Sequence, residues 1–302
     1  MDVTILGNNS ALPAFGRHPT AQAVNLDGEI LLLDCGEGTQ IQMQQFGIRW
    51  RKVQHIFISH LHGDHYFGLP GLLNSMSLLG RASPLYLHAP KALETIIQDI
   101  LKVADTRLSY EYNFNPLPEN ETSMLVDNKL YSVFAFPVEH RIGCHGFLIT
   151  KKTKGRKILP EKCSEYDIPA YFFERLKRGE DYQRKDGFIV ENEWVTEAGP
   201  KEKKYAYCAD TIYTESFIGH IQGTNTIYHE CTYLDADSAK ATARFHSTAK
   251  QAASIALKAG AHQLLLGHFS SKYRELDEFK TEAETIFPNV IVTREGETYH
   301  VD

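Results

Sequence analysis

Three histidines and an aspartate fall within six residues, in the run His60-Leu61-His62-Gly63-Asp64-His65. Four adjacent polar side chains are difficult to satisfy in an apolar core, so packing does not account for this cluster. His60 and His62 are two residues apart and can bind one ion from a turn. Asp64 and His65 then project toward a neighbouring position, and Gly63 relieves the tight backbone. The run predicts a two-metal hydrolase site, which the fold must complete with further ligands.

The further ligands are expected at the ends of predicted apolar strands. Four polar residues stand one to four positions past such strands: His60, His140, Asp210 and His268. Loops at strand ends on a rigid sheet are where α/β enzymes gather functional groups. Imidazole and carboxylate ligands without a thiolate suit zinc, with manganese and iron as alternatives.

Strand-like and helix-like segments alternate along the chain. Apolar runs predict strands at residues 3–6, 29–34, 54–59, 85–88, 131–136, 146–149, 204–210, 226–230 and 263–266. Helical spacing predicts helices at 39–46, 69–79, 91–103 and 249–259, the last capped by Ser247-Thr248 and Gly260. This alternation predicts an α/β fold with helices packed outside the sheets.

Composition limits the compartment and the partners. No apolar run approaches the roughly 20 residues that a membrane helix needs. The first residues lack the basic and apolar regions of a signal peptide, so we expect a cytoplasmic protein with no membrane partner. Five widely spaced cysteines without a CxxC pair argue against disulfides and a cysteine zinc finger, and predict buried thiols. The net charge of −6 is not that of a typical nucleic-acid binder.

One segment has the opposite charge. Residues 151–185 are basic, turn-rich and aromatic, and they lie between two strand-rich blocks. We therefore expect an insertion there, with residues 1–150 and 186–302 forming the main domain. Eleven basic and six acidic residues give the stretch from Thr150 to Lys185 a local charge of +5. A basic segment on an acidic body can form a phosphate-binding surface.

In this context H-x-H-x-D-H resembles the metallo-β-lactamase superfamily, and further blocks narrow the resemblance to the ribonuclease Z family, the tRNA 3′-processing endonucleases. The similarity runs nearly end to end. It is carried by residues 6–7, 33–40, 59–65, 176–180, 209–211, 229–233 and 267–273.

This resemblance implies a metallo-β-lactamase αββα sandwich with an inserted protruding arm. It also implies a ligand set of seven residues. His60, His62 and His140 would hold one zinc, Asp64, His65 and His268 the second, and Asp210 would bridge them. Such a pair activates a bridging water and clamps a phosphodiester. Asp64 would also orient or deprotonate that water.

The resemblance further assigns a proton donor. His246, in the block Phe245-His246-Ser247-Thr248, would protonate the leaving 3′-oxygen, oriented by an acid such as Glu230. Without the family match, His246 is more simply read as a helix-cap neighbour with a local hydrogen bond. Ser270, Ser271 and Lys272 would hold RNA phosphate, against the alternative of a solvated loop.

The segment at 151–185 aligns with the family's arm, which grips the tRNA elbow. The RNA-binding residues expected there are Arg175, Lys177 and Arg178, against the alternative of a solvated charged excursion. The family's Gly-Pro turn is absent from residues 167–176. The resemblance also implies a homodimer in which one subunit's arm serves the partner's site.

Three hypotheses for function follow. The first is a zinc-dependent endoribonuclease that removes the 3′ trailer from precursor tRNA and leaves a 3′-hydroxyl. The second is another hydrolase of this fold, acting on a small phosphodiester, thioester or sulfate ester. The third is a metal-bearing but inactive RNA-binding or scaffold protein. The basic segment favours the first over the second, and the complete ligand set disfavours the third.

Overall fold

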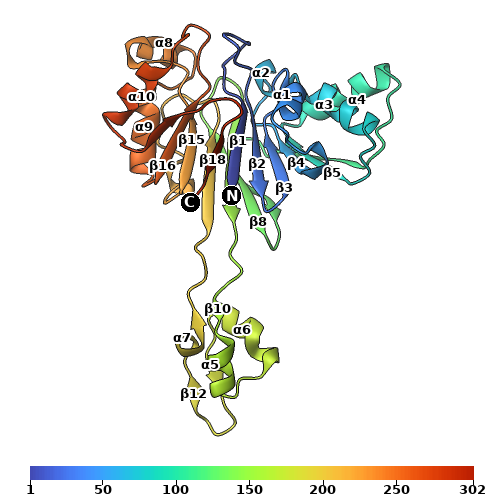
Figure 1. The fold of residues 1–302 in the computed structure, drawn as a ribbon. Coiled ribbons are helices and arrows are strands. Elements are labelled where there is room, and N and C mark those ends of the chain that lie inside the picture. The colour runs from blue at the N-terminus through green and yellow to red at the C-terminus, as the bar shows by residue number, and fades with distance from the viewer. The chain divides into compact units, whose positions relative to one another are not determined.

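Two seven-stranded sheets face each other in the computed structural model, which describes residues 1–302 (Figure 1). The first sheet has the spatial order β18 (Thr298–His300), β1 (Asp2–Gly7), β2 (Ala21–Leu26), β3 (Glu29–Leu33), β4 (Val53–Phe57), β5 (Leu85–Ala89) and β6 (Tyr112–Pro116). The second has the order β17 (Val290–Val292), β16 (Gln263–Gly267), β15 (Thr226–Glu230), β14 (Lys203–Cys208), β9 (Cys144–Lys151), β8 (Tyr131–Val138) and β7 (Ser123–Asp127).

Helices lie on the outer face of each sheet (Figure 1). The first sheet is covered by α1 (Thr39–Gln45), α3 (Leu69–Leu78) and α4 (Ala92–Val103), and the second by α9 (Ala249–Lys258) and α10 (Asp277–Glu284). Shorter elements are η1 (Trp50–Lys52), α2 (Gly63–Tyr66), η3 (Ile218–His220), η4 (Asp235–Asp237) and α8 (Ser238–Ala243). Thr248 caps α9 in a capping box with Gln251, and Gly260 follows with φ of +63°, which confirms the predicted caps.

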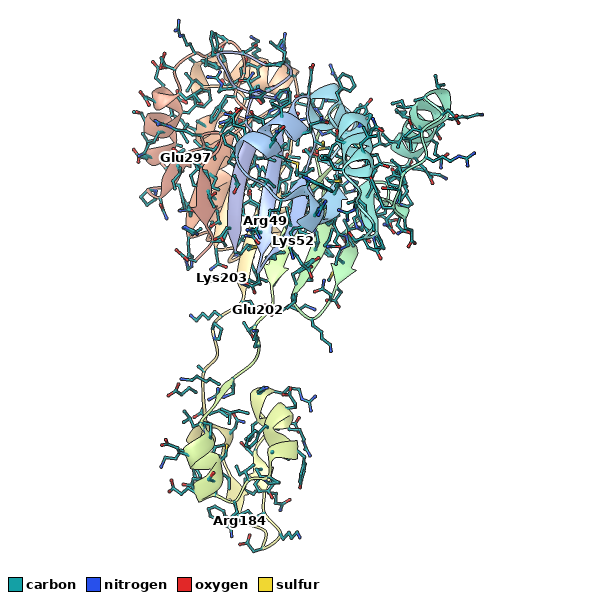
Figure 2. The ribbon with its side chains drawn as sticks, turned by 45° about the vertical axis from the view of Figure 1, so that its right-hand side comes forward. Arg49, Lys52, Arg184, Glu202, Lys203 and Glu297 are labelled. Atoms are coloured by element: carbon teal, nitrogen blue, oxygen red, sulfur yellow. The ribbon has the colours of Figure 1, made fainter.

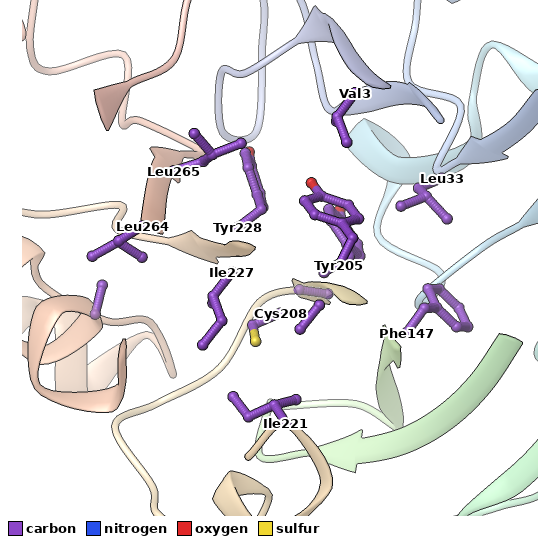
Figure 3. Close-up of a cluster of buried hydrophobic side chains, with 14 of the residues drawn as sticks. Val3, Leu33, Phe147, Tyr205, Cys208, Ile221, Ile227, Tyr228, Leu264 and Leu265 are labelled. Carbon is purple, nitrogen blue, oxygen red and sulfur yellow. The ribbon is translucent and has the colours of Figure 1, made fainter. Parts of the chain in front are cut away.

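Alternation along the strands explains the two layers of core. In β3, Leu31 and Leu33 face the second sheet, while Ile30 and Leu32 face the helices. The inner layer joins Val3 and Leu33 of the first sheet to aromatic side chains of the second, including Tyr205 (Figure 3). The four layers are the αββα sandwich that the resemblance implies.

Five strands of the two large sheets were not predicted: β2, β6, β7, β17 and β18. The last two are three residues long, too short for an alternating pattern to show. Residues at opposite ends of the chain form one pair, in which β18 lies antiparallel to β1 with Tyr299 opposite Val3. Pairing of this range depends on the assembled fold and leaves little trace in local sequence.

The inserted unit comprises Lys151–Glu202 and is a compact body of its own. Its elements are β10 (Lys157–Ile158), α5 (Pro160–Glu165), η2 (Ala170–Phe172), α6 (Phe173–Lys177), β11 (Tyr182–Gln183), β12 (Ile189–Val190), α7 (Asn192–Val195) and β13 (Thr196–Glu197). It extends beyond the predicted end at residue 185, because β10 pairs with β13. A small core of Cys163, Ile168, Phe172, Leu176, Val190 and Val195 holds it together.

This longer unit is nearly neutral. Its twelve basic and eleven acidic residues give a net charge of +1, because most of the charged residues within 186–202 are acidic. Many of its cations already have acidic partners. Arg184, labelled in Figure 2 in the loop between β11 and β12, lies 3.5 Å from Asp186. The local charge of +5 is therefore offset within the same folded unit.

None of the helices combines the length and the apolar composition that a membrane span requires. All five cysteines are free and buried, as predicted.

Two histidines on neighbouring strands, the half-buried His55 and the buried His88, make the fold sensitive to acid. His55 Nδ1 and His88 Nε2 lie 3.0 Å apart on β4 and β5, and His88 stacks on Phe57. Burial lowers the pKa of His55 to about 4 and that of His88 to about 3. An unfolded histidine titrates near pH 6.5. Below that pH the unfolded chain therefore binds protons that the folded chain does not bind.

We therefore expect the free energy of unfolding to fall as the pH drops from 7 to 5, by about 2 kcal/mol per histidine. The double variant His55→Gln/His88→Gln removes both titrating groups and should lose correspondingly less. Urea unfolding of both proteins, with a chelator present to exclude metal effects, measures the difference. The same loss in both proteins would contradict this explanation.

Candidate metal centre

Strand ends bring the predicted ligands together at one edge of the sandwich. His60 stands three residues after β4, and His62, Asp64 and His65 follow in the next loop and in α2. From the second sheet, His140 follows β8, Asp210 follows β14 and His268 follows β16. Seven residues from two sheets therefore meet at this edge, where the sequence predicted a metal site.

The first group consists of three imidazoles and a carboxylate. His62 Nδ1 lies 3.0 Å from His60 Nε2 and 3.1 Å from His140 Nε2. Asp210 Oδ2 lies 3.6 Å from His60 Nε2 and 3.9 Å from His140 Nε2. Ligand atoms around a tetrahedral zinc ion are about 3.3 Å apart, so the spacing fits one ion.

The second group is built around Asp64, His65 and His268. Asp64 Oδ2 lies 3.6 Å from His65 Nε2 and 3.4 Å from His268 Nε2. The other oxygen of Asp210, Oδ1, lies 3.5 Å from His65 Nε2 and 3.2 Å from His268 Nε2. Asp210 thus offers one oxygen to each group, which is the geometry of a bridging ligand.

Unsatisfied atoms at this centre test whether it fits metal ions. His65 Nε2, His268 Nε2 and Asp210 Oδ1 are buried and have no hydrogen-bond partner. Leaving a buried polar atom unpaired costs about 1–3 kcal/mol, so three such atoms at one point need a common ligand. A cation satisfies all three together, and the donor set of imidazoles and carboxylates fits a pair of metal ions.

Hydrogen bonds on the far side of the rings fix how the histidines present their nitrogens. His140 Nδ1–H donates to the carbonyl oxygen of Phe245 at 2.8 Å, and His268 Nδ1 lies 2.9 Å from Thr232 Oγ1. Each bond leaves Nε2 facing the centre. His268 itself has φ of +61°, a left-handed conformation that costs free energy and is typical of functional positions.

Asp34, for which no role was predicted from the sequence, anchors His65. Fully buried after β3, the Asp34 carboxylate accepts the His65 Nδ1–H at 2.8 Å. It also accepts the Ser59 backbone N–H and hydroxyl at 2.7 and 2.9 Å, and the Tyr207 hydroxyl at 2.5 Å. The sequence signal that could have identified Asp34 is an acidic residue at the end of an apolar strand. Asp34 therefore holds the ring of His65 and the loop that carries it.

Asp34→Asn should weaken metal binding by about 10- to 100-fold, the usual effect of losing a carboxylate behind a ligand histidine. The amide nitrogen cannot accept the bonds that the carboxylate oxygens accept. Tyr207→Phe is the matched control, because it removes one donor to Asp34 and leaves the bond to His65. Metal affinity measured by competition with a chelator checks this, and an unchanged affinity in Asp34→Asn would rule out the anchoring role.

The half-buried His246 pairs with the buried Glu230 beside the ligands. Glu230 accepts the His246 Nδ1–H at 2.9 Å, and it also accepts the backbone N–H groups of Thr211, Thr232 and Ser247. His246 Nε2 makes no hydrogen bond, and the residue lines the pocket. Burial alone lowers the pKa of His246, but the Glu230 carboxylate outweighs it and raises the pKa to about 9. The Glu230 carboxylate therefore favours the protonated form of the His246 imidazole.

A pocket of about 690 Å³ opens over this centre. Ser270 and Ser271 line it, as do Arg141 and Arg244, which the sequence analysis did not single out. Lys272 does not line it and instead pairs with Asp237. The remaining predicted RNA-binding residues lie in the inserted unit, where Arg175 and Arg178 pair with Glu180 and Lys177 pairs with Glu174.

Comparisons with known proteins agree with this geometry. The family described as Anti-Pycsar protein Apyc1 matches residues 1–152. The ribonuclease Z of Parabacteroides distasonis is 41% identical over 295 residues, covering 98% of this chain and 97% of the relative. Among solved structures, the short form of human tRNase Z has a TM-score of 0.74 at 25% identity and covers all of both chains. The metallo-β-lactamase fold protein YhfI of Bacillus subtilis has a TM-score of 0.68 at 19% identity and covers 99% of both.

The two facing sheets and the His/Asp cluster at their edge define a metallo-β-lactamase-fold hydrolase. Within that class the similarity extends over nearly the full length of curated relatives. The chain belongs to the ribonuclease Z family.

Proposed function

We propose that this enzyme removes the 3′ trailer from precursor tRNA by hydrolysing one phosphodiester and leaving a 3′-hydroxyl on the tRNA. Membership of the ribonuclease Z family supports this substrate. The observation that carries the proposal is the combination, in one pocket, of a bridged His/Asp centre and a histidine held by a buried glutamate. Together they supply an activated nucleophile and a proton for the leaving group.

Two ions, which we propose to be zinc, fit the centre. The first would be held by His60, His62 and His140 and the second by Asp64, His65 and His268, with Asp210 between them. When bound, such a pair would activate water as the nucleophile and would neutralise the charge of the phosphate.

Asp64 is placed to orient the attacking water. Its Oδ2 accepts the backbone N–H of Ala11 at 2.7 Å and lies within 3.6 Å of the ligand nitrogens of His65 and His268. The neighbouring histidines outweigh the effect of burial and lower the pKa of Asp64, so its carboxylate is ionised. An ionised oxygen fixed from one side can accept a proton or a hydrogen bond from water on the other.

His246 supplies the proton that the leaving group needs. Its Nδ1–H is fixed on Glu230, so Nε2–H faces the pocket and can donate to the 3′-oxygen as that oxygen leaves. General acid catalysis of this kind contributes about 10²- to 10⁴-fold to a rate. Glu230 holds the ring and stabilises its charged form, and its own orientation is fixed by three backbone N–H groups.

We assign tRNA binding outside the pocket to the inserted unit. Its cations at Arg175, Lys177 and Arg178 are exposed, and exposed ion pairs contribute only about 0–1 kcal/mol, so RNA phosphates can replace their acidic partners. We further propose a homodimer in which the unit serves the partner's pocket, acting in the cytoplasm where tRNA is matured.

Substrate comparison tests the proposal. The purified enzyme is given a 3′-extended precursor tRNA, a small phosphodiester, a thioester and a sulfate ester, with and without a chelator. We expect the highest kcat/KM for the precursor tRNA and loss of its cleavage with the chelator. A higher kcat/KM for any of the small esters would favour the second hypothesis.

A further inference from the structure

An exposed aromatic ring stands on one wall of the pocket. Phe67 lines the pocket together with His62 and Asp64, and 62% of its surface is exposed. Its backbone N–H donates to the Gly63 carbonyl oxygen at 2.9 Å, which closes the turn of α2 that carries two of the ligands. The ring is therefore tied by the backbone to the ligand loop.

The ring has a fixed place. A Cβ atom on Gly63 would lie 2.1 Å from Phe67 Cε2, so the ring rests directly on the glycine backbone. On another side the ring of Tyr66 packs edge-on, with centroids 5.0 Å apart. Phe67 thus packs against the Gly63 backbone and the Tyr66 ring, and the remainder of its ring is open to solvent.

Two more apolar residues line the same pocket: Leu12, which is 51% exposed, and Pro13. Their loop is held at Asp64 by the bond from the Ala11 N–H, and Ala11 has a left-handed φ of +64°. Exposed apolar groups that line a binding pocket are where ligands make contact.

The residues that line the pocket from the second sheet include the polar side chains His246, Arg244 and Ser270. The part of the pocket that comes from the first sheet therefore offers a ring for a base, and the part that comes from the second sheet offers groups for phosphate and the leaving oxygen.

We propose that Phe67 is the stacking platform for the base of the first trailer nucleotide, the one that keeps the scissile phosphate. This inference rests on the proposed function. His246 faces the leaving 3′-oxygen, which belongs to the last nucleotide of the mature tRNA, so that nucleotide occupies the part of the pocket that comes from the second sheet. The phosphate stays with the trailer, and its nucleotide is left with the part that comes from the first sheet, where Phe67 stands. Every base has a π-face, so this contact serves trailers of any sequence.

Three precursor tRNAs test the platform: one intact, one abasic at the first trailer nucleotide, and one abasic at the last nucleotide of the mature tRNA. Phe67→Ala should lower kcat/KM on the intact substrate by roughly 5- to 150-fold, the range for loss of one stacked base. On the trailer-abasic substrate the same variant should match the wild type within about twofold, because no base is left to stack. Phe67→Trp should restore cleavage of the intact substrate. Ile41→Ala is the matched control, with the same 62% exposure outside the pocket.

Metal content, measured for every variant, separates stacking from damage to the ligand loop. An equal loss on the intact and trailer-abasic substrates, or no loss on either, would overturn the proposal. A loss that disappears only on the substrate lacking the last base of the mature tRNA would overturn the assignment to the trailer. If the wild type does not cut the intact precursor, the proposed function itself fails, whatever the variants do.

Discussion

His62→Ala should reduce hydrolysis by roughly 10³-fold or more, on precursor tRNA and on small phosphodiesters alike. His62 Nδ1 lies between the ring nitrogens of His60 and His140, so its loss removes the central ligand of one metal group. The ions supply several kcal/mol of transition-state stabilisation, which is the source of the expected loss. Rates on both substrates, together with metal analysis, measure the effect.

The metal analysis makes this prediction specific. The wild-type protein should contain close to two metal equivalents, and His62→Ala clearly fewer. His300→Ala is the control. His300 is an exposed histidine near the C-terminus, where it pairs with Asp2. One equivalent in the wild type, or full activity in His62→Ala, would refute the two-metal centre.

Removing the inserted unit should affect one substrate only. Residues 153–200 can be replaced by a short Gly-Ser linker, since β9 and β14 are neighbours in the second sheet and the body has its own core. Cleavage of precursor tRNA should fall by about 100-fold, because contacts to RNA phosphates are lost. Hydrolysis of a small phosphodiester should stay within a few-fold of the wild type, since the unit supplies no residue of the pocket.

A milder variant tests the positive charges of the inserted unit while the unit itself stays in place. Replacing Arg175, Lys177 and Arg178 together by Glu keeps the small core of the unit and reverses its exposed cations. It should weaken tRNA cleavage and reduce its dependence on salt. Equal losses on tRNA and on the small substrate in the deletion variant would argue against a tRNA-binding role.

The sequence predicted much of the body because its strongest signals are local. Strand ends followed by histidine or aspartate placed His60, His140, Asp210 and His268 correctly at one edge of the sheets. The signal for the caps of α9 also lies within a few positions of the helix, and these caps were predicted too. Each of these signals lies within a few residues of the structure it specifies.

Other features depend on contacts between distant parts of the chain. Asp34 lies 31 residues from His65 in sequence and becomes recognisable as its anchor only when β3 and β4 pair. The end of the inserted unit depends on pairing between β10 and β13, so charge alone placed it too early. Lys272 was expected to hold RNA phosphate because it follows the last ligand in sequence, but it pairs with Asp237 and does not line the pocket.

The most direct test of the account is to map the cut that the enzyme makes in a 3′-extended precursor tRNA. Wild-type enzyme loaded with metal is incubated with an end-labelled precursor, and both products are sized at nucleotide resolution with their termini identified. We predict a single cut at the junction of mature tRNA and trailer, with a 3′-hydroxyl on the tRNA and a 5′-phosphate on the trailer, and no cut after chelation. Scattered cuts, a 3′-phosphate on the tRNA, or cleavage that continues without metal would contradict the account.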